Sequence, residues 1–285
     1  MLVGTKEILE KAQKGRYAVG AFDVYNLETA LGLAQAAVNM NSPIIMMVSE
    51  TTIKYAGIKP ITHIVSTIAK NLAVKVPVAL HLDHGKNFES VVECVKAGFT
   101  SIHMDASDLP FDENMVLTKQ AVDFAHKKKI WVQGELGPVP GDHLAGGKFK
   151  GKLPKTDPSL IKEFVAKTDV DMLAIAVGPT HGVYTNEHID FKLLKQIRRS
   201  TNLPLVLHGS SGVPDKEIRQ AIKLGVAKIN VGTAVRVAFT KSLRQTVKTA
   251  PKNLVDARKM LAPSIEAVRK LAEQKIILFG SVNKA

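Results

Sequence analysis

The stretch Ala79-Leu80-His81-Leu82-Asp83-His84-Gly85 is an apolar run that ends in polar residues and a glycine. Its length and composition are typical of a strand that is buried on both faces. Similar runs recur along the chain, and a helix-sized segment follows each of the first seven. The predicted strands lie at residues 18–22, 43–49, 77–82, 101–104, 130–136, 172–177, 203–207 and 226–231. Eight successive β/α units in a chain of 285 residues predict a TIM (β/α)8 barrel, an α/β fold.

We expect one domain over residues 1–285, because no composition break and no 20–50-residue repeat divides the chain. A doubly wound open sheet is the alternative fold, but no Gly-x-Gly-x-x-Gly turn follows an early strand. Residues 137–156 and 250–263 are predicted to be long loops, of which the first is either a lid or a disordered insert. Apolar residues at 265, 268, 271, 276 and 277 predict a C-terminal helical extension that packs on the barrel or on another subunit.

Composition narrows the class of protein. Apolar residues make up 45% of the chain, which predicts a globular core, and no apolar run is long enough to cross a membrane. The first residues lack the features of a secretory signal, and Cys94 is the single cysteine, so we expect a reducing, cytoplasmic setting. The net charge of +13 favours anionic ligands. Nucleic acid is disfavoured as a partner, because only 5% of the residues are aromatic and the basic clusters carry almost no stacking side chains.

Four predicted strand ends carry a residue that could bind a metal ion. His84, Glu135, His181 and His208 each lie at or just after the end of a different strand. In a TIM barrel the carboxyl ends of the strands meet at one mouth, so these four side chains should converge. Three imidazoles with an optional carboxylate and an open position are typical of a catalytic zinc site. For any one histidine, a buried structural role is the alternative.

Asp83 adjoins a predicted ligand, and strand alternation should send His81 and Asp83 to one side and His84 to the other until the turn distorts the path. A carboxylate in this position can exchange a proton with a substrate hydroxyl. The alternative for Asp83 is a hydrogen-bond acceptor that orients a ligand histidine. His81, further inside the strand, is expected to be structural or to support a ligand.

Glycines and hydroxyls are dense after the sixth, seventh and eighth strands, at residues 181–182, 208–212 and 230–233. Backbone N–H groups and hydroxyls at such positions can cradle a phosphate, and barrels often bind one after strands seven and eight. A phosphorylated substrate would also account for the positive charge. A plain turn is the alternative for residues 209–212.

Five blocks of the sequence resemble a known family. The segments 79–85, 132–137, 181–184, 205–212 and 227–233 are similar, in order and spacing, to those of the class II, metal-dependent ketose-bisphosphate aldolases, the fructose- and tagatose-bisphosphate aldolase group. The resemblance extends from residues 18–22 to residues 279–281. It implies a dimeric or tetrameric TIM barrel, a carbon–carbon lyase of carbohydrate metabolism such as glycolysis, with zinc on His84, His181 and His208. Glu135 matches a glutamate that ligates or flanks the zinc.

The resemblance also implies roles for other residues. Asp83 matches the acid that moves the proton of the C4 hydroxyl, Asp105 an aspartate near a monovalent-cation region, and Arg258 a late arginine that reaches a neighbouring subunit's phosphate site. The residues that match contacts to the substrate are Asn26, Ser49, Gly182, Gly209, Ser211, Asn230 and Thr233.

The implied reaction is the reversible cleavage of fructose or tagatose 1,6-bisphosphate into dihydroxyacetone phosphate and glyceraldehyde 3-phosphate. Cleavage beside a carbonyl leaves negative charge on an enediolate, and a divalent metal lowers that barrier. An aldolase that forms a lysine imine would instead need a desolvated lysine on a strand. Lys228 is the one candidate for that alternative, and the predicted metal ligands make it unnecessary.

Several positions depart from the family pattern. Gln133-Gly134 stands where the family usually has Glu-Ala, Asp23 where it has Asn, and Thr185 where some fructose-specific members have Lys. After Gly137 the family usually continues Gly-Gly-x-Glu-Asp, whose glutamate helps to move the carbon-bound proton. Here Asp142 or His143 would have to replace it, and His143 has a suitable ordinary pKa. These departures permit two alternatives: a paralog acting on another ketose phosphate, or a non-catalytic regulatory subunit.

Overall fold

The computed structural model describes residues 1–139, 154–180, 182 and 187–285, and these form a closed barrel of eight parallel strands. The strands are β1 (Val19–Asp23), β2 (Ile44–Ser49), β3 (Val78–Gly85), β4 (Ser101–Met104), β5 (Trp131–Leu136), β6 (Met172–Ile175), β7 (Leu205–Leu207) and β8 (Val226–Val231). Each strand pairs with the next, and β8 pairs with β1. The predicted TIM barrel is confirmed, and all eight predicted strands are present.

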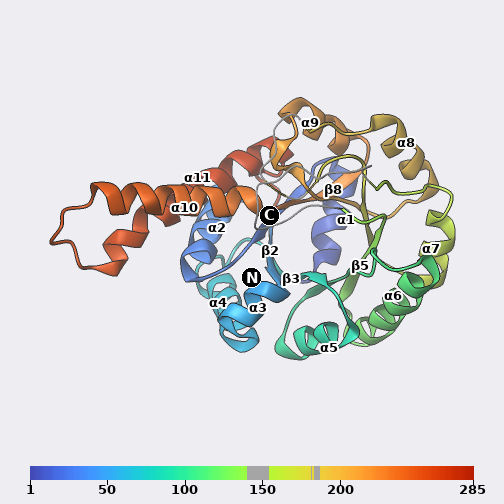
Figure 1. Ribbon diagram of the computed structural model, residues 1–285, viewed down its shortest axis with the longest axis horizontal. Helices are drawn as coiled ribbons and strands as arrows, with labels where there is room; N and C mark the ends of the chain where they lie inside the picture. Colours follow the sequence, from blue (N-terminus) through green and yellow to red (C-terminus); the bar gives the residue numbers. More distant parts are fainter. Residues whose placement is uncertain (140–153, 181, 183–186) are drawn as a thin grey trace.

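Helices surround the barrel (Figure 1). They are α1 (Thr5–Gly15), α2 (Leu27–Asn39), α3 (Glu50–Ala56), α4 (Ile58–Asn71), α5 (Phe88–Ala97), α6 (Phe111–His126), α7 (Ile161–Thr168), α8 (Phe191–Ser200), the 3-10 turn η1 (Ser210–Gly212), α9 (Asp215–Lys223), α10 (Thr233–Thr249) and α11 (Ala257–Phe279). Among the described residues, no helix is both long enough and apolar enough to span a membrane.

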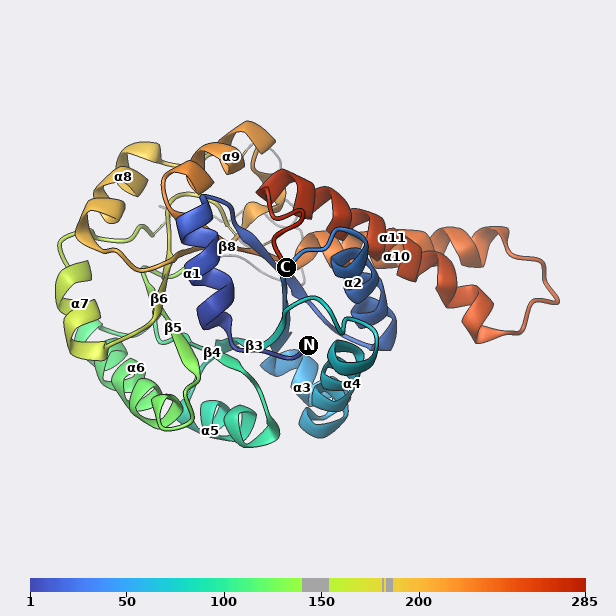
Figure 2. The ribbon, with the colours of Figure 1, turned by 180° about the vertical axis from the view of Figure 1, so that it is seen from behind.

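Helices α10 and α11 form a hairpin that projects away from the barrel (Figures 1 and 2). The predicted C-terminal helix is α11, and its C-terminal part packs on α2 and on β1. The predicted loop at residues 250–263 was wrong in its second half, because α11 begins at Ala257 and includes Pro263. Asp256 caps the helix by accepting a hydrogen bond from the Arg258 amide at 3.0 Å. Packing against α10 supports the helix through the proline.

Two apolar clusters build the core. One fills the space between the strands and the surrounding helices, and it includes Phe22, Leu80 and Phe99. The other fills the half of the barrel interior near the amino ends of the strands, where Ile8 and Leu9 of α1 contact inward side chains of the sheet. Helix α1 therefore closes the bottom of the barrel (Figure 2), and polar side chains collect at the opposite end.

Candidate metal centre and active site

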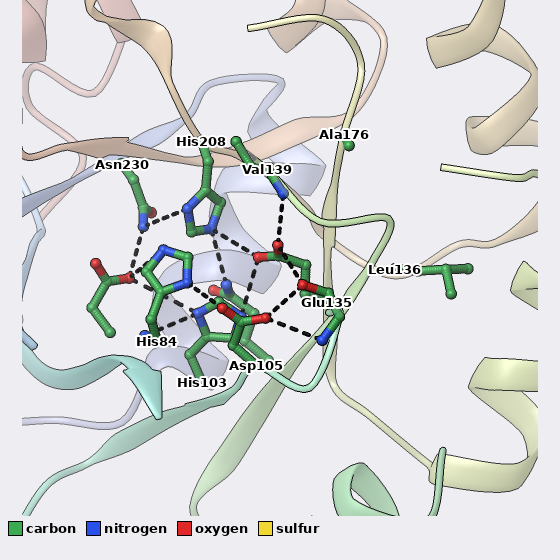
Figure 3. A network of polar contacts seen from close by, with 12 residues as sticks. His84, His103, Asp105, Glu135, Leu136, Val139, Ala176, His208 and Asn230 are labelled. Carbon is green, nitrogen blue, oxygen red and sulfur yellow. Dashed lines mark hydrogen bonds and ion pairs between the residues drawn. The ribbon is translucent and has the colours of Figure 1, made fainter. Parts of the chain in front are cut away.

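Polar side chains from six strands or strand ends meet inside the barrel at the carboxyl ends of the strands. Asp23 ends β1, Asp83 and His84 end β3, His103 lies in β4, Glu135 in β5 and Asn230 in β8, while His208 directly follows β7. Five of these seven side chains are buried and the other two, Asp23 and His84, are partly buried, although all are charged or polar. Figure 3 shows most of them pointing toward one another. Buried polar groups need partners in the protein or in a ligand, so their contacts indicate what the site can do.

A break in strand regularity places Asp83 and His84 together. The register between β3 and β4 shifts between Leu82 and Gly85, and His84 adopts a left-handed backbone with φ of 50°. In a regular strand these two neighbours would point to opposite faces. Here the Nε2 atom of His84 lies 4.0 Å from the Oδ1 atom of Asp83. The predicted distortion at the turn therefore brings both side chains to the same site.

Asp105 fixes the ring of His84. The Nδ1 atom of His84 lies 2.6 Å from Asp105 Oδ2, and Lys86 Nζ donates to the same oxygen at 2.7 Å. Burial lowers the pKa of His84, but the carboxylates of Asp83, Asp105 and Glu135 outweigh it and raise the pKa to about 9. Because a carboxylate accepts from Nδ1, Nε2 is the ring atom of His84 that is suited to bind a metal.

Asp105 thus supports a predicted ligand, a role that the sequence did not indicate. Its other oxygen, Oδ1, accepts hydrogen bonds from the amide and the hydroxyl of Ser107. Burial raises the pKa of Asp105, but the hydrogen bond and the charge of His84 reverse this shift and lower it. The monovalent-cation site beside Asp105 stays a prediction.

His208 lies beside His84, and the centroids of the two rings are 4.8 Å apart. Its Nε2 atom is 3.2 Å from Gln133 Nε2 and 3.9 Å from Glu135 Oε2. Its Nδ1 atom is 3.5 Å from the amide nitrogen of Asn230. The structure therefore brings together three of the four predicted metal ligands, His84, Glu135 and His208. The fourth, His181, lies outside the described residues, as does the predicted catalytic residue His143.

His103 joins this cluster although the sequence pattern did not indicate it as a site residue. Its ring is fully buried, with its centroid 4.7 Å from that of His84 and 5.5 Å from that of His208. The available signal was its position in the predicted strand at residues 101–104, where a polar side chain interrupts a buried apolar run. Because His103 neither ends its strand nor precedes a glycine, it did not fit the pattern used to choose the other histidines.

The described residues fit a divalent metal ion. Ligand atoms of His84, His103 and His208 all lie within 4.8 Å of one another, and a second group joins His84 and His103 to Asp105 and Glu135. Imidazole nitrogens with a carboxylate are donors that suit zinc among the common divalent ions.

Asp83 is held in its ionised form. Burial by itself raises the pKa of Asp83, but His84, His103, His208 and Lys228 outweigh it and hold the pKa well below its ordinary value. Asn230 donates a hydrogen bond from Nδ2 to Asp83 Oδ1 at 3.0 Å. The carboxylate is therefore oriented, and it is in the ionised form that a proton acceptor requires.

The ammonium of Lys228 links several buried polar side chains near Asp83. Its fully buried ammonium donates to the side-chain oxygens of Gln133 and Asn230, both at 2.8 Å, and lies 3.4 Å from His81 Nε2. His81 Nδ1 in turn lies 2.8 Å from the hydroxyl of Ser101. Burial lowers the pKa of Lys228 to about 8, and burial also lowers that of His81. His81 thus supports the polar network, as expected from its place inside the strand.

A pocket opens beside Asp83 and Asn230. Its lining residues are Asp23, Met47, Asp83, Gly182, Gly209, Ser210, Ser211, Asn230, Gly232 and Thr233. The residues predicted to cradle a phosphate therefore surround one pocket. Gly209 has φ of 68°, and a Cβ atom there would lie 2.5 Å from the Thr180 carbonyl oxygen, so only glycine suits this turn.

Asp23 contributes a second carboxyl group to the pocket. Its Oδ2 atom accepts a hydrogen bond from the Tyr25 hydroxyl at 2.6 Å, and the guanidinium of Arg236 lies over the Tyr25 ring. Burial and the nearby charge of Asp83 raise the pKa of Asp23 to about 7. Asp23, which stands where the family usually has Asn, therefore faces the pocket directly.

Three other predicted substrate contacts have structural partners within the chain. Asn26 caps α2 and Ser49 caps α3, each by accepting a hydrogen bond from an amide of the first turn. Arg258 is 92% exposed near the start of α11, where it pairs with Asp256 at 3.0 Å. It does not line the pocket of its own chain among the described residues, so its role toward a neighbouring subunit stays a prediction.

The barrel and its polar centre together define a barrel enzyme with a site for a metal ion and an anionic substrate. Residues 3–284 match the family model described as fructose-bisphosphate aldolase class-II. The chain belongs to this family and is an aldolase, a carbon–carbon lyase. The family depends on a metal ion.

Individual proteins support the assignment. The chain is 42% identical to a fructose-bisphosphate aldolase from Staphylococcus aureus, with 100% of this chain and 99% of the relative covered. It is 41% identical to one from Geobacillus stearothermophilus over the same shares. Among solved structures, the YdjI aldolase from Escherichia coli superposes with a TM-score of 0.88 at 34% identity, with both chains covered completely.

Proposed function

We propose that this aldolase reversibly cleaves a ketose 1,6-bisphosphate, of fructose or tagatose, into dihydroxyacetone phosphate and glyceraldehyde 3-phosphate, with zinc as its metal. One observation carries the proposal. The ionised Asp83 lies between the cluster of His84 and His208 and a pocket lined by glycines and hydroxyls. A proton-accepting group, a metal site and an anion cradle are the three parts that this reaction needs.

His84, His181 and His208 are the proposed zinc ligands, with Glu135 beside them. When bound, the ion polarises the substrate carbonyl and stabilises the negative charge that develops during cleavage, an effect of several kcal/mol. The chain's contribution is to hold its ligands in place, as Asp105 does for His84. A monovalent cation near Asp105 is a further proposed component.

Asp83 is the proposed catalytic residue. In the cleavage direction its carboxylate accepts the proton of the C4 hydroxyl, and in the condensation direction it returns that proton. Asn230 supports this role, because Lys228 occupies the Asn230 oxygen and turns the Asn230 amide toward Asp83. His143 is the proposed group that moves the carbon-bound proton, in place of the glutamate usual in the family.

The phosphates of the substrate are proposed to bind at the glycine- and hydroxyl-rich rim of the pocket. Backbone N–H groups near Gly182 and Gly209, with the hydroxyls of Ser211 and Thr233, supply donors for one phosphate. Asn26 and Ser49 are proposed as further polar contacts. Arg258 is proposed to reach the phosphate site of a neighbouring subunit.

The decisive experiment compares fructose and tagatose 1,6-bisphosphates side by side in a coupled assay of the zinc-loaded protein. We expect cleavage of at least one of them, loss of activity with a chelator, and recovery with zinc. The His84→Ala variant should be inactive, and borohydride should trap no adduct. A borohydride-stabilised adduct on Lys228 would overturn the metal mechanism.

A second candidate is a paralog that acts on another ketose phosphate, or a regulatory subunit without activity. Asp23 favours this alternative, because a second carboxyl group in the pocket changes the charge that a substrate meets. Failure of both bisphosphates with a fully metal-loaded protein would support it.

We further propose that the enzyme is a homodimer or homotetramer in the cytoplasm. Exposed valines on the hairpin of α10 and α11, among them Val237, Val247 and Val255, support association. Cys94, the chain's single cysteine, is buried and is compatible with a reducing compartment. Light scattering of the purified protein would give the number of subunits, and a monomer would contradict the first part of this proposal.

A further inference from the structure

We propose that His103 is a positioning residue whose ring N–H holds the Glu135 carboxylate beside the metal site and keeps it from becoming a permanent metal ligand. The inference rests on the proposed metal-dependent function and deepens it. It concerns a contact between two fully buried side chains, in which His103 Nε2 lies 3.4 Å from Glu135 Oε2.

The backbone sets the tautomer of His103. The amide N–H of His84 donates a hydrogen bond to His103 Nδ1 at 3.2 Å. A neutral imidazole has one donor nitrogen and one acceptor nitrogen, so acceptance at Nδ1 places the ring proton on Nε2. Among the described residues neither His103 Nε2 nor Glu135 Oε2 has a hydrogen-bond partner, and the two buried atoms lie 3.4 Å apart, so each is the nearest candidate partner of the other.

The same tautomer leaves His103 without a lone pair for a metal ion, so His84 and His208 remain as the ligands within the close group of three histidines. The Nδ1 lone pair of His103 is taken by the His84 amide, and its Nε2 atom carries the proton. His84 has the opposite arrangement, because its Nδ1 atom lies against Asp105 and its Nε2 atom is suited to the metal. Two neighbouring histidines thus have different tasks.

Glu135 is held at its other oxygen as well. Its Oε1 atom accepts from the Ser107 hydroxyl at 3.1 Å and from the Val139 amide at 3.3 Å. Its Oε2 atom faces His103 at 3.4 Å and His208 at 3.9 Å. Rotation of the carboxylate toward the metal site would therefore have to break the contact with His103.

The consequence concerns the open coordination position. A catalytic zinc site keeps a position for the substrate, whereas a further protein ligand would close it. Without the His103 N–H, a metal ion is the strongest partner left for the buried Glu135 Oε2. Coordination should then rise by one oxygen, the metal should leave more slowly, and turnover should fall.

The test uses cobalt(II) as a spectroscopic probe in the full-length protein and compares two amide variants. In His103→Asn the short amide still accepts from the His84 amide but does not reach Glu135, whereas in His103→Gln the longer amide restores an N–H toward Glu135. We expect His103→Asn to weaken the visible cobalt bands about twofold or more, to slow metal release to a chelator, and to lower kcat about tenfold. His103→Gln should return all three to within about threefold of the wild type.

Adding Glu135→Gln to His103→Asn should restore the strong cobalt bands, because the competing carboxylate is gone. Unchanged cobalt bands and metal release in a folded His103→Asn protein would overturn the proposal, and so would a His103→Gln variant that resembles His103→Asn. The cobalt readout does not depend on any sugar phosphate. A wild-type protein that cleaves no ketose bisphosphate would thus overturn the proposed reaction without deciding the role of His103.

Discussion

The two halves of the barrel interior are lined by different kinds of side chain. Near the amino ends of the strands the inward side chains are apolar, and α1 packs against them. Near the carboxyl ends the inward side chains of the described residues include acids, imidazoles, amides and the ammonium of Lys228, and most of them contact one another. The strands are continuous through both halves, so one scaffold carries a packed core at one end and a chemical centre at the other.

The two halves of the barrel interior should respond differently to substitution. Removal of an apolar side chain leaves a cavity and costs stability. Removal of a charge from the polar half should change the reaction while the strands keep their packing.

Asp83→Asn should lower kcat by roughly 10²–10⁴-fold, because the amide cannot accept the substrate proton. The amide oxygen can still accept from Asn230, but the variant loses the charge that His84, His208 and Lys228 stabilise, so the melting temperature should also fall. Steady-state kinetics and a melting curve measure the two effects. The matched control is Asp123→Asn, which changes an exposed carboxylate of α6 and should leave kcat unchanged. An Asp83→Asn enzyme with near-normal kcat would contradict the assigned role.

Ile45→Ala should destabilise the fold by about 2–5 kcal/mol, because Ile45 is fully buried in the apolar half. The kcat per folded molecule should stay within about twofold of the wild type. Chemical denaturation and kinetics below the unfolding transition check both parts. Ile277→Ala is the control, since Ile277 is 59% exposed on α11 and its loss should change stability by less than about 0.5 kcal/mol. A large fall in kcat for folded Ile45→Ala would contradict the idea that the apolar half affects stability and not the reaction.

Asp23→Asn should stabilise the protein above neutral pH. Its pKa is raised to about 7 in the folded state, so the folded protein binds more protons than the unfolded chain between about pH 4 and pH 7. The protonated Asp23 carboxyl makes its full contribution to stability below the ordinary pKa of an aspartate. This contribution is lost as the pH rises through 7 and the buried group ionises. The variant should therefore be more stable than the wild type at pH 8, and the difference should shrink toward zero at pH 4.

Melting curves of Asp23→Asn and wild type across this pH range measure the difference. We also expect KM for a bisphosphate to fall at pH 8, because a negative charge leaves the pocket. Equal melting temperatures of the two proteins at pH 8 would rule out a buried, strained carboxylate at this position.

Arg258→Ala should have the smallest effect on the single chain. Arg258 pairs with Asp256 on the exposed hairpin, so melting should be unchanged. If its guanidinium binds a phosphate in a neighbouring subunit, KM should rise several-fold while the oligomer stays intact. Kinetics with light scattering on the same sample measure both. An unchanged KM in the intact oligomer would remove Arg258 from the substrate site.

The barrel could be predicted from the sequence because its signals are local. Each strand is an apolar run of the expected length, and each helix shows its own periodicity. The predicted ligands His84 and His208 could be selected because the ends of parallel strands converge, and the structure brings them together. The helix through Pro263 could not, because it depends on packing between α10 and α11 rather than on local preference.

Parts of the centre lay beyond the sequence because they depend on contacts between distant strands. The partner of His84 is Asp105, on the segment after β4, and no spacing rule links the two. The place of His103 follows from its packing against β3 and β5, and a histidine inside a short strand has no local signature. Asn26 and Ser49 were predicted as substrate contacts, and the structure shows that they cap helices. The sequence does not distinguish the two roles, because a polar residue after a strand and before a helix suits either one.

The left-handed backbone of His84 carries a cost of its own. Most side chains adopt this conformation with a penalty of about 1–3 kcal/mol, whereas glycine adopts it readily. Glycine at this position would remove that penalty, but it would also remove the ring that pairs with the buried carboxylate of Asp105. The backbone strain at His84 is therefore held in place by the same contact that orients the ring, and a His84→Gly protein should unfold at a lower temperature than the wild type.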